Sequence, residues 1–373
     1  MCHHEHNNIT KAAELGQAIW LDQISRDMID SGEIQELVDH GLRGITTNPT
    51  IFDGAIEASD VYDDRLADYA KDGSPAEVVF ERIAVEDVRD AADILRPTYE
   101  ALNYRDGFVS IEVNPHLAHD TEGTIAEARR LWASVDRPNI MIKVPGTPEG
   151  APAITTLISE GINVNVTLLF SLDAYKAAAN AYLDGITKYA NAGNGSPAHI
   201  ASVASFFVSR VDTLADELLP AGSDLTGEIG IANAKSAYRE YQRIFASDLN
   251  DNTRFFSLNT IGAQPQRPLW ASTSVKNPEY PPTLYFDELL GPDTVNTLPL
   301  PTVNDVLATG TIAETLTSDV DEAEARLAQL ETEGVSYTAV TDQLLVEGVQ
   351  KFADSWDDLM ARIETKVSTL ATA

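Results

Sequence analysis

The sequence contains very little cysteine and no long hydrophobic run. Its single cysteine, Cys2, excludes an intramolecular disulfide and a cysteine-based metal site. No stretch of 18 apolar residues occurs, so the sequence predicts no membrane-spanning helix. The first residues, MCHHEHNN, do not include the apolar core of a signal peptide. We therefore expect a cytoplasmic protein with no membrane partner, and a flexible N-terminus over residues 1–10.

Positive charge is also scarce. The chain has 26 Lys and Arg against 58 Asp and Glu, which gives a formal net charge of -32 at pH 7. Nucleic acids and anionic membranes are bound by basic surfaces, so this balance argues against both as partners. An anionic substrate would need a local group of cations, although repulsion from distant charges is screened beyond about 8 Å at physiological salt.

What the sequence does have is a regular alternation of short apolar segments and amphipathic segments. Eight predicted strands, each followed by a helical segment, match the count of a (β/α)₈ barrel. A doubly wound sheet would need a Gly-rich phosphate-binding turn after the first strand, and residues 22–25, DQIS, do not form one. We therefore predict the α/β class, with residues 1–373 forming a single TIM barrel. The predicted strands are residues 18–21, 44–46, 108–113, 140–144, 163–169, 199–207, 268–272 and 295–300. The predicted long helical segments are residues 34–40, 76–95, 121–134, 172–192 and 230–247.

Two segments exceed a minimal barrel. Residues 53–76 are expected to form a loop with short helices. Residues 311–373 are expected to form a C-terminal helical extension packed on the barrel. Within that extension, Trp356, Leu359, Ile363 and Val367 recur at helical spacing, which is typical of a core-facing stripe. A lid over the barrel mouth is the alternative interpretation.

The fourth predicted strand contains one lysine, Lys143, in the otherwise apolar run IMIKVP of residues 140–145. Burying an ammonium group costs several kcal/mol unless it is paired or neutral. Desolvation favours the free amine, which can attack a carbonyl and form a Schiff base. The alternative is that Lys143 reaches solvent just before the turn at Pro145 and Gly146.

Other polar residues fall at the ends of the predicted strands, where a barrel places its active site. Six polar groups at six successive strand ends fit a Schiff-base site that must also move protons. Simpler interpretations exist, because Asp22 and Asn48 could cap helices and Glu112 could pair with Lys143 for structural reasons. The eighth strand is expected to end near residues 301–304. The candidate side chains at the other ends are Asp22, Asn48, Glu112, Lys143, Asn165, Thr167, Ser205 and Ser272.

Four segments resemble the motifs of transaldolases, in the order in which that family has them. They are GITTNPTI at residues 44–51, NIMIKVP at 139–145, NVNVTLLFS at 163–171 and SFFVSR at 205–210. Together they span most of the predicted barrel, and the chain resembles the longer bacterial transaldolases. The resemblance implies a (β/α)₈ barrel enzyme that needs no cofactor and no metal.

The implied reaction transfers a dihydroxyacetone unit between sugar phosphates. The donor would be sedoheptulose 7-phosphate or fructose 6-phosphate, and the acceptor glyceraldehyde 3-phosphate or erythrose 4-phosphate, in the non-oxidative pentose phosphate pathway. The alternatives are an enzyme like the fructose-6-phosphate aldolases and a non-catalytic sugar-phosphate-binding barrel. Glu112, Phe207 and the chain length favour the transferase, because the related aldolases are shorter and have Gln and Tyr at these places. The sequence does not distinguish a monomer from a homodimer.

The resemblance also implies roles for the catalytic residues. Lys143 would be the Schiff-base nucleophile, and Asp22 would be the general acid and base at the substrate C4 hydroxyl. Glu112 and Thr167 would hold a water that relays protons.

The remaining candidates would bind substrate. Arg210 would bind phosphate, because its guanidinium fork matches that group. Many transaldolases have a second arginine shortly after the serine at the end of strand seven; here Lys276 stands nearby and is the candidate, with a solvated loop lysine as the alternative. The other expected substrate contacts are Asn48, Asn165, Ser205, Phe207 and Ser272.

Overall fold

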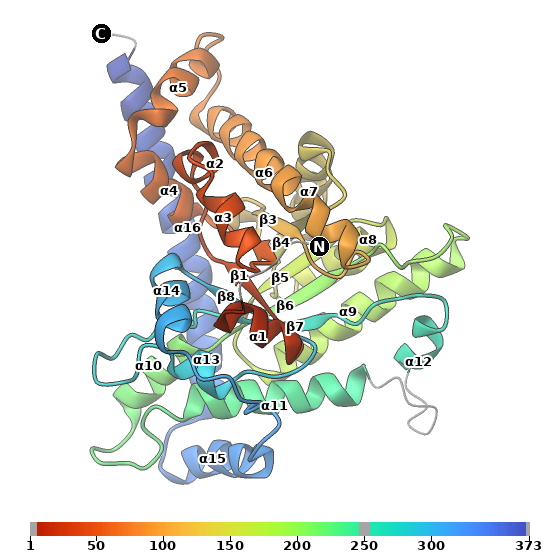
Figure 1. The fold of residues 1–373 in the computed structure, drawn as a ribbon, viewed down its shortest axis with the longest axis vertical. Helices are drawn as coiled ribbons and strands as arrows, with labels where there is room; N and C mark the ends of the chain where they lie inside the picture. Colours follow the sequence, from red (N-terminus) through yellow and green to blue (C-terminus); the bar gives the residue numbers. More distant parts are fainter. Residues whose placement is uncertain (1–5, 246–253, 371–373) are drawn as a thin grey trace.

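The computed structural model describes residues 6–245 and 254–370, and its eight strands close into one barrel (Figure 1). Neighbouring strands are parallel and follow the chain order from β1 to β8, with β8 pairing back to β1. The predicted α/β TIM barrel is therefore confirmed. The strands are β1 Gln17–Leu21, β2 Gly44–Ile45, β3 Phe108–Glu112, β4 Ile140–Pro145, β5 Val164–Leu169, β6 Ser202–Phe207, β7 Arg267–Ala271 and β8 Thr294–Leu298.

Large side chains fill the end of the barrel opposite to the strands' carboxyl ends. Trp20 of β1 is fully buried there, and a Cβ on Gly44 of β2 would come within 2.4 Å of its ring. Only glycine leaves room for the indole at this position. Its Nε1 donates to Asp106, which is also paired with Arg267 at 2.8 Å. This packing closes one end, so the other end carries the cavity.

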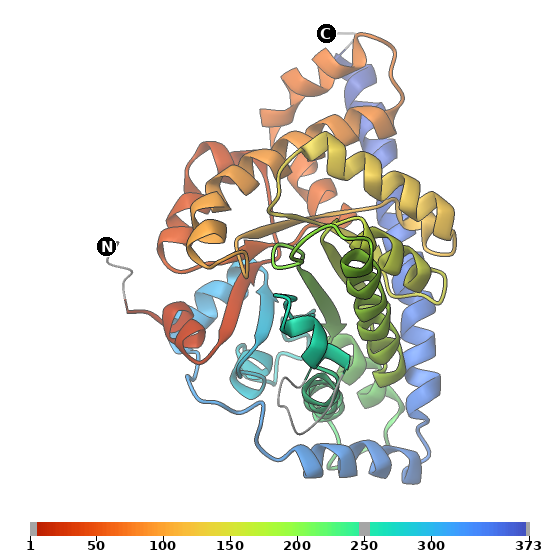
Figure 2. The ribbon, with the colours of Figure 1, turned by 90° about the vertical axis from the view of Figure 1, so that its right-hand side faces the viewer.

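Helices surround the barrel (Figures 1 and 2), and their bounds follow in chain order. The N-terminal half has α1 Asn8–Glu14, α2 Arg26–Asp30, α3 Glu33–Asp39, α4 Pro49–Ala58, η1 Asp60–Tyr62, α5 Asp63–Ala70, α6 Ala76–Ala101, η2 Pro115–Leu117, α7 Thr121–Val135, α8 Gly150–Ser159 and α9 Leu172–Asn191. The C-terminal half has α10 Ser209–Leu218, α11 Ile229–Ile244, α12 Arg254–Asn259, α13 Leu284–Glu288, α14 Leu300–Thr309, α15 Val320–Thr332 and α16 Tyr337–Leu370. No helix of these described ranges is long and apolar enough to span a membrane.

Two expectations about chain segments are corrected. The flexible terminus expected over residues 1–10 is helical from Asn8 onward, because Asn7 and Thr10 form a capping box and Ile9 is buried; residues 1–5 lie outside the described residues. The eighth strand ends at Leu298 rather than near residues 301–304. Pro301 lies in the first turn of α14, where proline is favoured, so Asn304 is on a helix.

The helical segments also differ at their ends. Helix α6 continues past the predicted end at residue 95, through Pro97, because Tyr99 is still buried against the barrel. The helix predicted over residues 230–247 runs from Ile229 to Ile244. Residues 246 and 247, the end of the predicted helix, lie outside the described part of the chain.

The C-terminal extension consists of α15 and α16. Helix α16 packs against α4, α5 and α6 and touches β5, and Figure 2 shows it running the length of the molecule. Trp356, Leu359 and Ile363 are buried and Val367 packs against the same core. The predicted core-facing stripe is confirmed, and a turn in the middle of the helix also reaches the barrel mouth.

Candidate active site

A cavity of about 310 Å³ opens at the carboxyl ends of the strands. Nine of the eleven predicted site residues line it, whereas Glu112 and Asn165 are not among its lining residues. No group of three or more His, Cys, Asp or Glu side chains in the described residues is placed to hold a metal ion. The lining residues predicted from sequence are Asp22, Asn48, Lys143, Thr167, Ser205, Phe207, Arg210, Ser272 and Lys276.

Lys143 lies at the base of the cavity and is 5% exposed. The register of β3, β4 and β5 sets Lys143 between Glu112 and Asn165. Its Nζ donates to the carbonyl of Thr47 at 3.1 Å and lies 3.3 Å from Oε2 of Glu112. The amine is thus held inside the barrel, and the alternative of a lysine that reaches bulk solvent does not hold.

Glu112 is the carboxyl group next to that amine. Burial raises its pKa to about 7, although the positive charge of Lys143 opposes the shift. Oε2 of Glu112 faces Nζ of Lys143, whereas Oε1 of Glu112 and Oγ1 of Thr167 are buried without a hydrogen-bonding partner among the residues described. These two atoms can therefore bond to a water or to substrate, and Glu112 can gain or lose a proton near neutral pH.

Asp22 follows β1 at the cavity wall and does not cap a helix, because Ser25 caps α2. Its Oδ1 accepts a hydrogen bond from Oγ1 of Thr46 at 2.7 Å, and that hydroxyl lies 2.6 Å from Oγ1 of Thr297. Burial raises the pKa of Asp22, and the charge of Lys143 and the bond from Thr46 oppose this. The carboxyl is held in one orientation and favours proton uptake more than a solvated aspartate does.

Asn48 has both of the roles considered from sequence. Its Oδ1 accepts from the backbone N–H of Ile51 at 3.0 Å, which caps α4, and the residue also lines the cavity. The cap fixes the side chain at the end of β2.

Asn165 is placed differently from the expectation. It is fully buried, its Nδ2 donates to Oγ of Ser110 at 3.0 Å, and its Oδ1 accepts from Oγ of Ser205 at 2.6 Å. The two serines thus use both the nitrogen and the oxygen of the amide. Asn165 does not line the cavity itself but orients Ser205, which does.

Two cations define the outer part of the cavity. Arg210 follows β6, and its guanidinium carbon lies 5.3 Å from the centre of the Phe207 ring. Nζ of Lys276 donates to Oγ of Ser274 at 2.7 Å. Burial lowers the pKa of both cations, and the charge of Arg210 further lowers the pKa of Lys276. Such a pair favours binding of an anion, which would relieve the repulsion.

The loop that leads to Lys276 begins at Ser272. This residue has φ of 54°, in the left-handed region, and its Oγ lies 2.9 Å from Oγ of Ser209. The backbone of Ser209 also donates to the Ser272 carbonyl at 2.9 Å. These bonds support a strained turn at the cavity wall.

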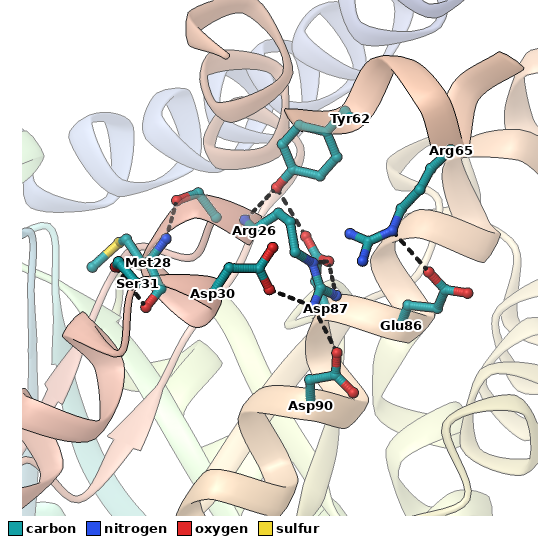
Figure 3. Close-up of polar contacts among 10 residues, drawn as sticks. Arg26, Met28, Asp30, Ser31, Tyr62, Arg65, Glu86, Asp87 and Asp90 are labelled. Atoms are coloured by element: carbon teal, nitrogen blue, oxygen red, sulfur yellow. Dashed lines mark hydrogen bonds and ion pairs between the residues drawn. The ribbon is translucent and has the colours of Figure 1, made fainter. Parts of the chain in front are cut away.

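The segment after Asp22 is held by a buried ion cluster, shown in Figure 3. Arg26 of α2 donates from Nε to Asp87 of α6 at 2.9 Å and from Nη1 to Asp90 at 2.7 Å. The hydroxyl of Tyr62 accepts from the backbone of Arg26 and donates to Asp87 at 2.9 Å. The cluster fixes the start of α2, four residues after the catalytic candidate.

Sequence reasoning missed several lining residues. Thr46 and Thr297 could have been found from their places near the ends of β2 and β8, where inward-facing polar side chains reach the mouth. Lys351 and Phe352 of α16 also line the cavity. No local pattern predicts that this turn of a distant helix lies over the barrel.

Comparisons with known proteins agree with this geometry. The family model for transaldolase/fructose-6-phosphate aldolase matches residues 19–363. A Thermobifida fusca protein named transaldolase is 47% identical over 96% of this chain and 98% of its own length. Streptomyces avermitilis transaldolase 1 is 48% identical over 96% of both chains, and Mycobacterium tuberculosis transaldolase is 45% identical over 98% of both. The chain therefore belongs to the transaldolase/fructose-6-phosphate aldolase family.

Proposed function

We propose that the protein is a transaldolase that transfers a dihydroxyacetone unit from a ketose phosphate to an aldose phosphate. The observation that carries the proposal is the buried Nζ of Lys143, 3.3 Å from Glu112, in a cavity that Asp22, Arg210 and Lys276 also line. Sedoheptulose 7-phosphate and fructose 6-phosphate are the proposed donors. Glyceraldehyde 3-phosphate and erythrose 4-phosphate are the proposed acceptors.

Catalysis begins when the free amine of Lys143 attacks the ketose C2 carbonyl. The resulting carbinolamine loses water to give an iminium ion, which accepts the electron pair of the C3–C4 bond when that bond breaks. Asp22 takes the proton of the C4 hydroxyl, and the shortened aldose phosphate leaves. The three-carbon enamine then adds to the acceptor aldehyde, and Asp22 returns the proton to the new hydroxyl.

Glu112 and Thr167 serve the formation and loss of the carbinolamine. The Glu112 carboxyl, with a pKa of about 7, takes a proton from the Lys143 ammonium and supplies one to the departing hydroxyl. Oε1 of Glu112 and Oγ1 of Thr167, which have no hydrogen-bonding partner in the described part of the chain, can hold the water through which the proton passes. The pairing of Lys143 with Glu112 is thus part of the chemistry rather than only structural.

Arg210 and Lys276 bind the phosphate group, which both the donor and the acceptor carry. A fixed cation within a few ångströms outweighs a diffuse negative field, because exposed charges farther than about 8 Å are screened at physiological salt. This local pair is how a chain with a net charge of -32 can bind an anionic sugar.

The covalent step can be tested with a borohydride trap. Reduction in the presence of fructose 6-phosphate should attach a reduced three-carbon unit to Lys143, located by peptide mass spectrometry. Lys143→Ala should give no adduct and no turnover while it keeps the far-UV circular dichroism of the wild type. An adduct on another lysine, or turnover by Lys143→Ala, would refute the assignment.

Transfer is distinguished from simple aldol cleavage by the acceptor. With fructose 6-phosphate, product formation should rise strongly when erythrose 4-phosphate is added, because the apolar Phe207 offers no acid to protonate the enamine. Steady release of dihydroxyacetone at the same rate without acceptor would assign the aldolase reaction instead.

A further inference from the structure

One turn of the C-terminal helix forms part of the active-site wall. Lys351 and Phe352 of α16 line the same cavity as Lys143, Arg210 and Lys276. They lie more than 130 residues along the chain from the last of the four sequence motifs. Their position gives α16 a part in the site beyond its core-facing stripe.

Several contacts fix this turn over the barrel. Gly348 lies against β5, where an added Cβ would be 3.0 Å from Leu168, a residue whose own φ is 60°. Farther along α16, Ser355 accepts a hydrogen bond from Thr50 at 2.9 Å. Arg362 pairs with Asp53 of α4 at 2.6 Å. The turn between Gly348 and Ser355 is therefore held at both ends.

Phe352 is buried and lies over the nucleophile. Nζ of Lys143 is 5.6 Å from the centre of its ring, within the range of a cation–π contact. The adjacent Lys351 lines the same cavity and is near enough to Lys276 for its charge to act on that lysine.

Lys351 is exposed, and no acidic side chain of the described residues pairs with it. Its charge lowers the pKa of Lys276, as does that of Arg210. Three cations from three separate elements, α10, the loop after β7 and α16, thus line one cavity, and the charges of Arg210 and Lys351 both act on Lys276. Unpaired cations gathered in so acidic a chain point to a polyanionic ligand group.

We propose that Lys351 is a third phosphate-binding cation and sets the preference of the enzyme for phosphorylated over unphosphorylated sugars. This inference rests on the proposed function for the identity of the substrate. The phosphate would lie between Arg210, Lys276 and Lys351, and Lys351 would contribute binding energy without taking part in bond breaking. Removing the charge of Lys351 by substitution should therefore raise KM and leave kcat nearly unchanged.

The test compares Lys351→Gln with wild type, with Lys351→Arg and with the control Lys366→Gln. Lys366 is on the same helix but pairs with Asp63 and does not line the cavity. Lys351→Gln should raise the KM for fructose 6-phosphate about tenfold and leave kcat within twofold. It should also weaken inhibition by inorganic phosphate by a similar factor. Lys351→Arg should restore both values, and Lys366→Gln should not change them.

Two results overturn the inference. The first is a KM and a phosphate inhibition constant for Lys351→Gln that stay within twofold of wild type. The second is an equal rise for Lys366→Gln, which would indicate only a loss of net positive charge. Binding of inorganic phosphate, followed by thermal shift, separates this inference from the proposed function. A wild-type protein without turnover or adduct refutes the function, whereas loss of phosphate binding in Lys351→Gln still supports the cation site.

Discussion

At the scale of single residues, the proposed chemistry depends on two carboxyl groups in different surroundings. Glu112 is buried beside an amine, and Asp22 is fixed by a threonine hydroxyl at the cavity wall. Burial raises the pKa of both groups, so each holds a proton more readily than a solvated carboxylate. The different partners suit different roles in the proposed mechanism, where Glu112 serves the nitrogen chemistry at C2 and Asp22 serves the oxygen at C4.

We predict that Glu112 sets the acid limb of the pH–rate profile. As the pH falls through about 7, Glu112 becomes protonated and can no longer accept a proton from Lys143, so kcat/KM should fall on the acid side. Glu112→Gln should lower kcat/KM about a hundredfold and remove this limb. The measurement is a coupled assay from pH 5.5 to 8.5. A Glu112→Gln variant that keeps both the rate and the limb would contradict the role.

Asp22→Asn should separate Schiff-base formation from carbon–carbon cleavage. The amide cannot take the C4 proton, so kcat should fall by about 10²–10⁴. Lys143 should still form the iminium with the intact sugar. With fructose 6-phosphate, borohydride should therefore fix the whole six-carbon sugar phosphate on Lys143 instead of a three-carbon unit. Mass spectrometry distinguishes the two adducts. A three-carbon adduct at the wild-type rate would show that another group takes the proton.

At the scale of elements, the site depends on how closely α16 approaches β5. Gly348→Val adds a branched side chain at a position where even a single added Cβ would lie 3.0 Å from Leu168. We predict a loss of about 1–3 kcal/mol in the free energy of unfolding, measured with urea, and a raised KM as Lys351 and Phe352 move outward.

Gly54 provides the matched control for that substitution. It lies in α4, and a Cβ there would meet no atom within 4 Å. Gly54→Ala should raise the free energy of unfolding by about 0.5–1 kcal/mol and leave KM unchanged, because alanine is the better helix former. If both substitutions had the same effect on KM, close packing of α16 would not be the cause.

The cluster in Figure 3 should behave as one energetic unit. Asp87→Ala leaves the guanidinium of Arg26 buried without its main partner, which should cost about 3–5 kcal/mol. Adding Arg26→Met should restore a large part of the loss, since the double variant buries no unpaired charge. Urea unfolding of both single variants and the double variant measures the coupling. Additive losses would show that the two side chains act independently.

The features of the site that could be predicted from sequence are those that leave a pattern in the neighbouring residues of the chain. Lys143 stood out because one cation interrupts an apolar strand, and the barrel rule then placed Asp22 and Thr167 beside it. Alternation placed Asn165 on the inward face of its strand, and the resemblance to transaldolases implied that it touches substrate. Alternation does not show how deep in the barrel a side chain lies. The amide of Asn165 lies deep enough to be hydrogen-bonded by Ser110 and Ser205 instead of facing the cavity. The place of Lys351 depends on the packing of α16 across the mouth, which no spacing in the sequence specifies.

At the scale of the whole molecule, net charge opposes both stability and substrate binding. The chain carries -32 formal charges, so its surface repels itself and repels sugar phosphates. Many arginines lie in ion pairs with acidic side chains, such as Arg129 with Glu160, and cannot serve as ligands. By contrast, Arg210, Lys276 and Lys351 of the cavity form no ion pair with an acidic side chain in residues 6–245 and 254–370.

We predict that added salt stabilises the protein. Screening shortens the reach of repulsion from about 30 Å at 0.01 M to about 3 Å at 1 M ionic strength, so the Tm should rise by several degrees over that range. Sodium, potassium and tetramethylammonium chlorides should act alike at equal ionic strength, because screening does not depend on the identity of the cation. The measurement is differential scanning calorimetry at pH 7.5. A Tm that falls with salt would show that the ion pairs outweigh the repulsion, and a rise with only one cation would indicate specific ion binding instead.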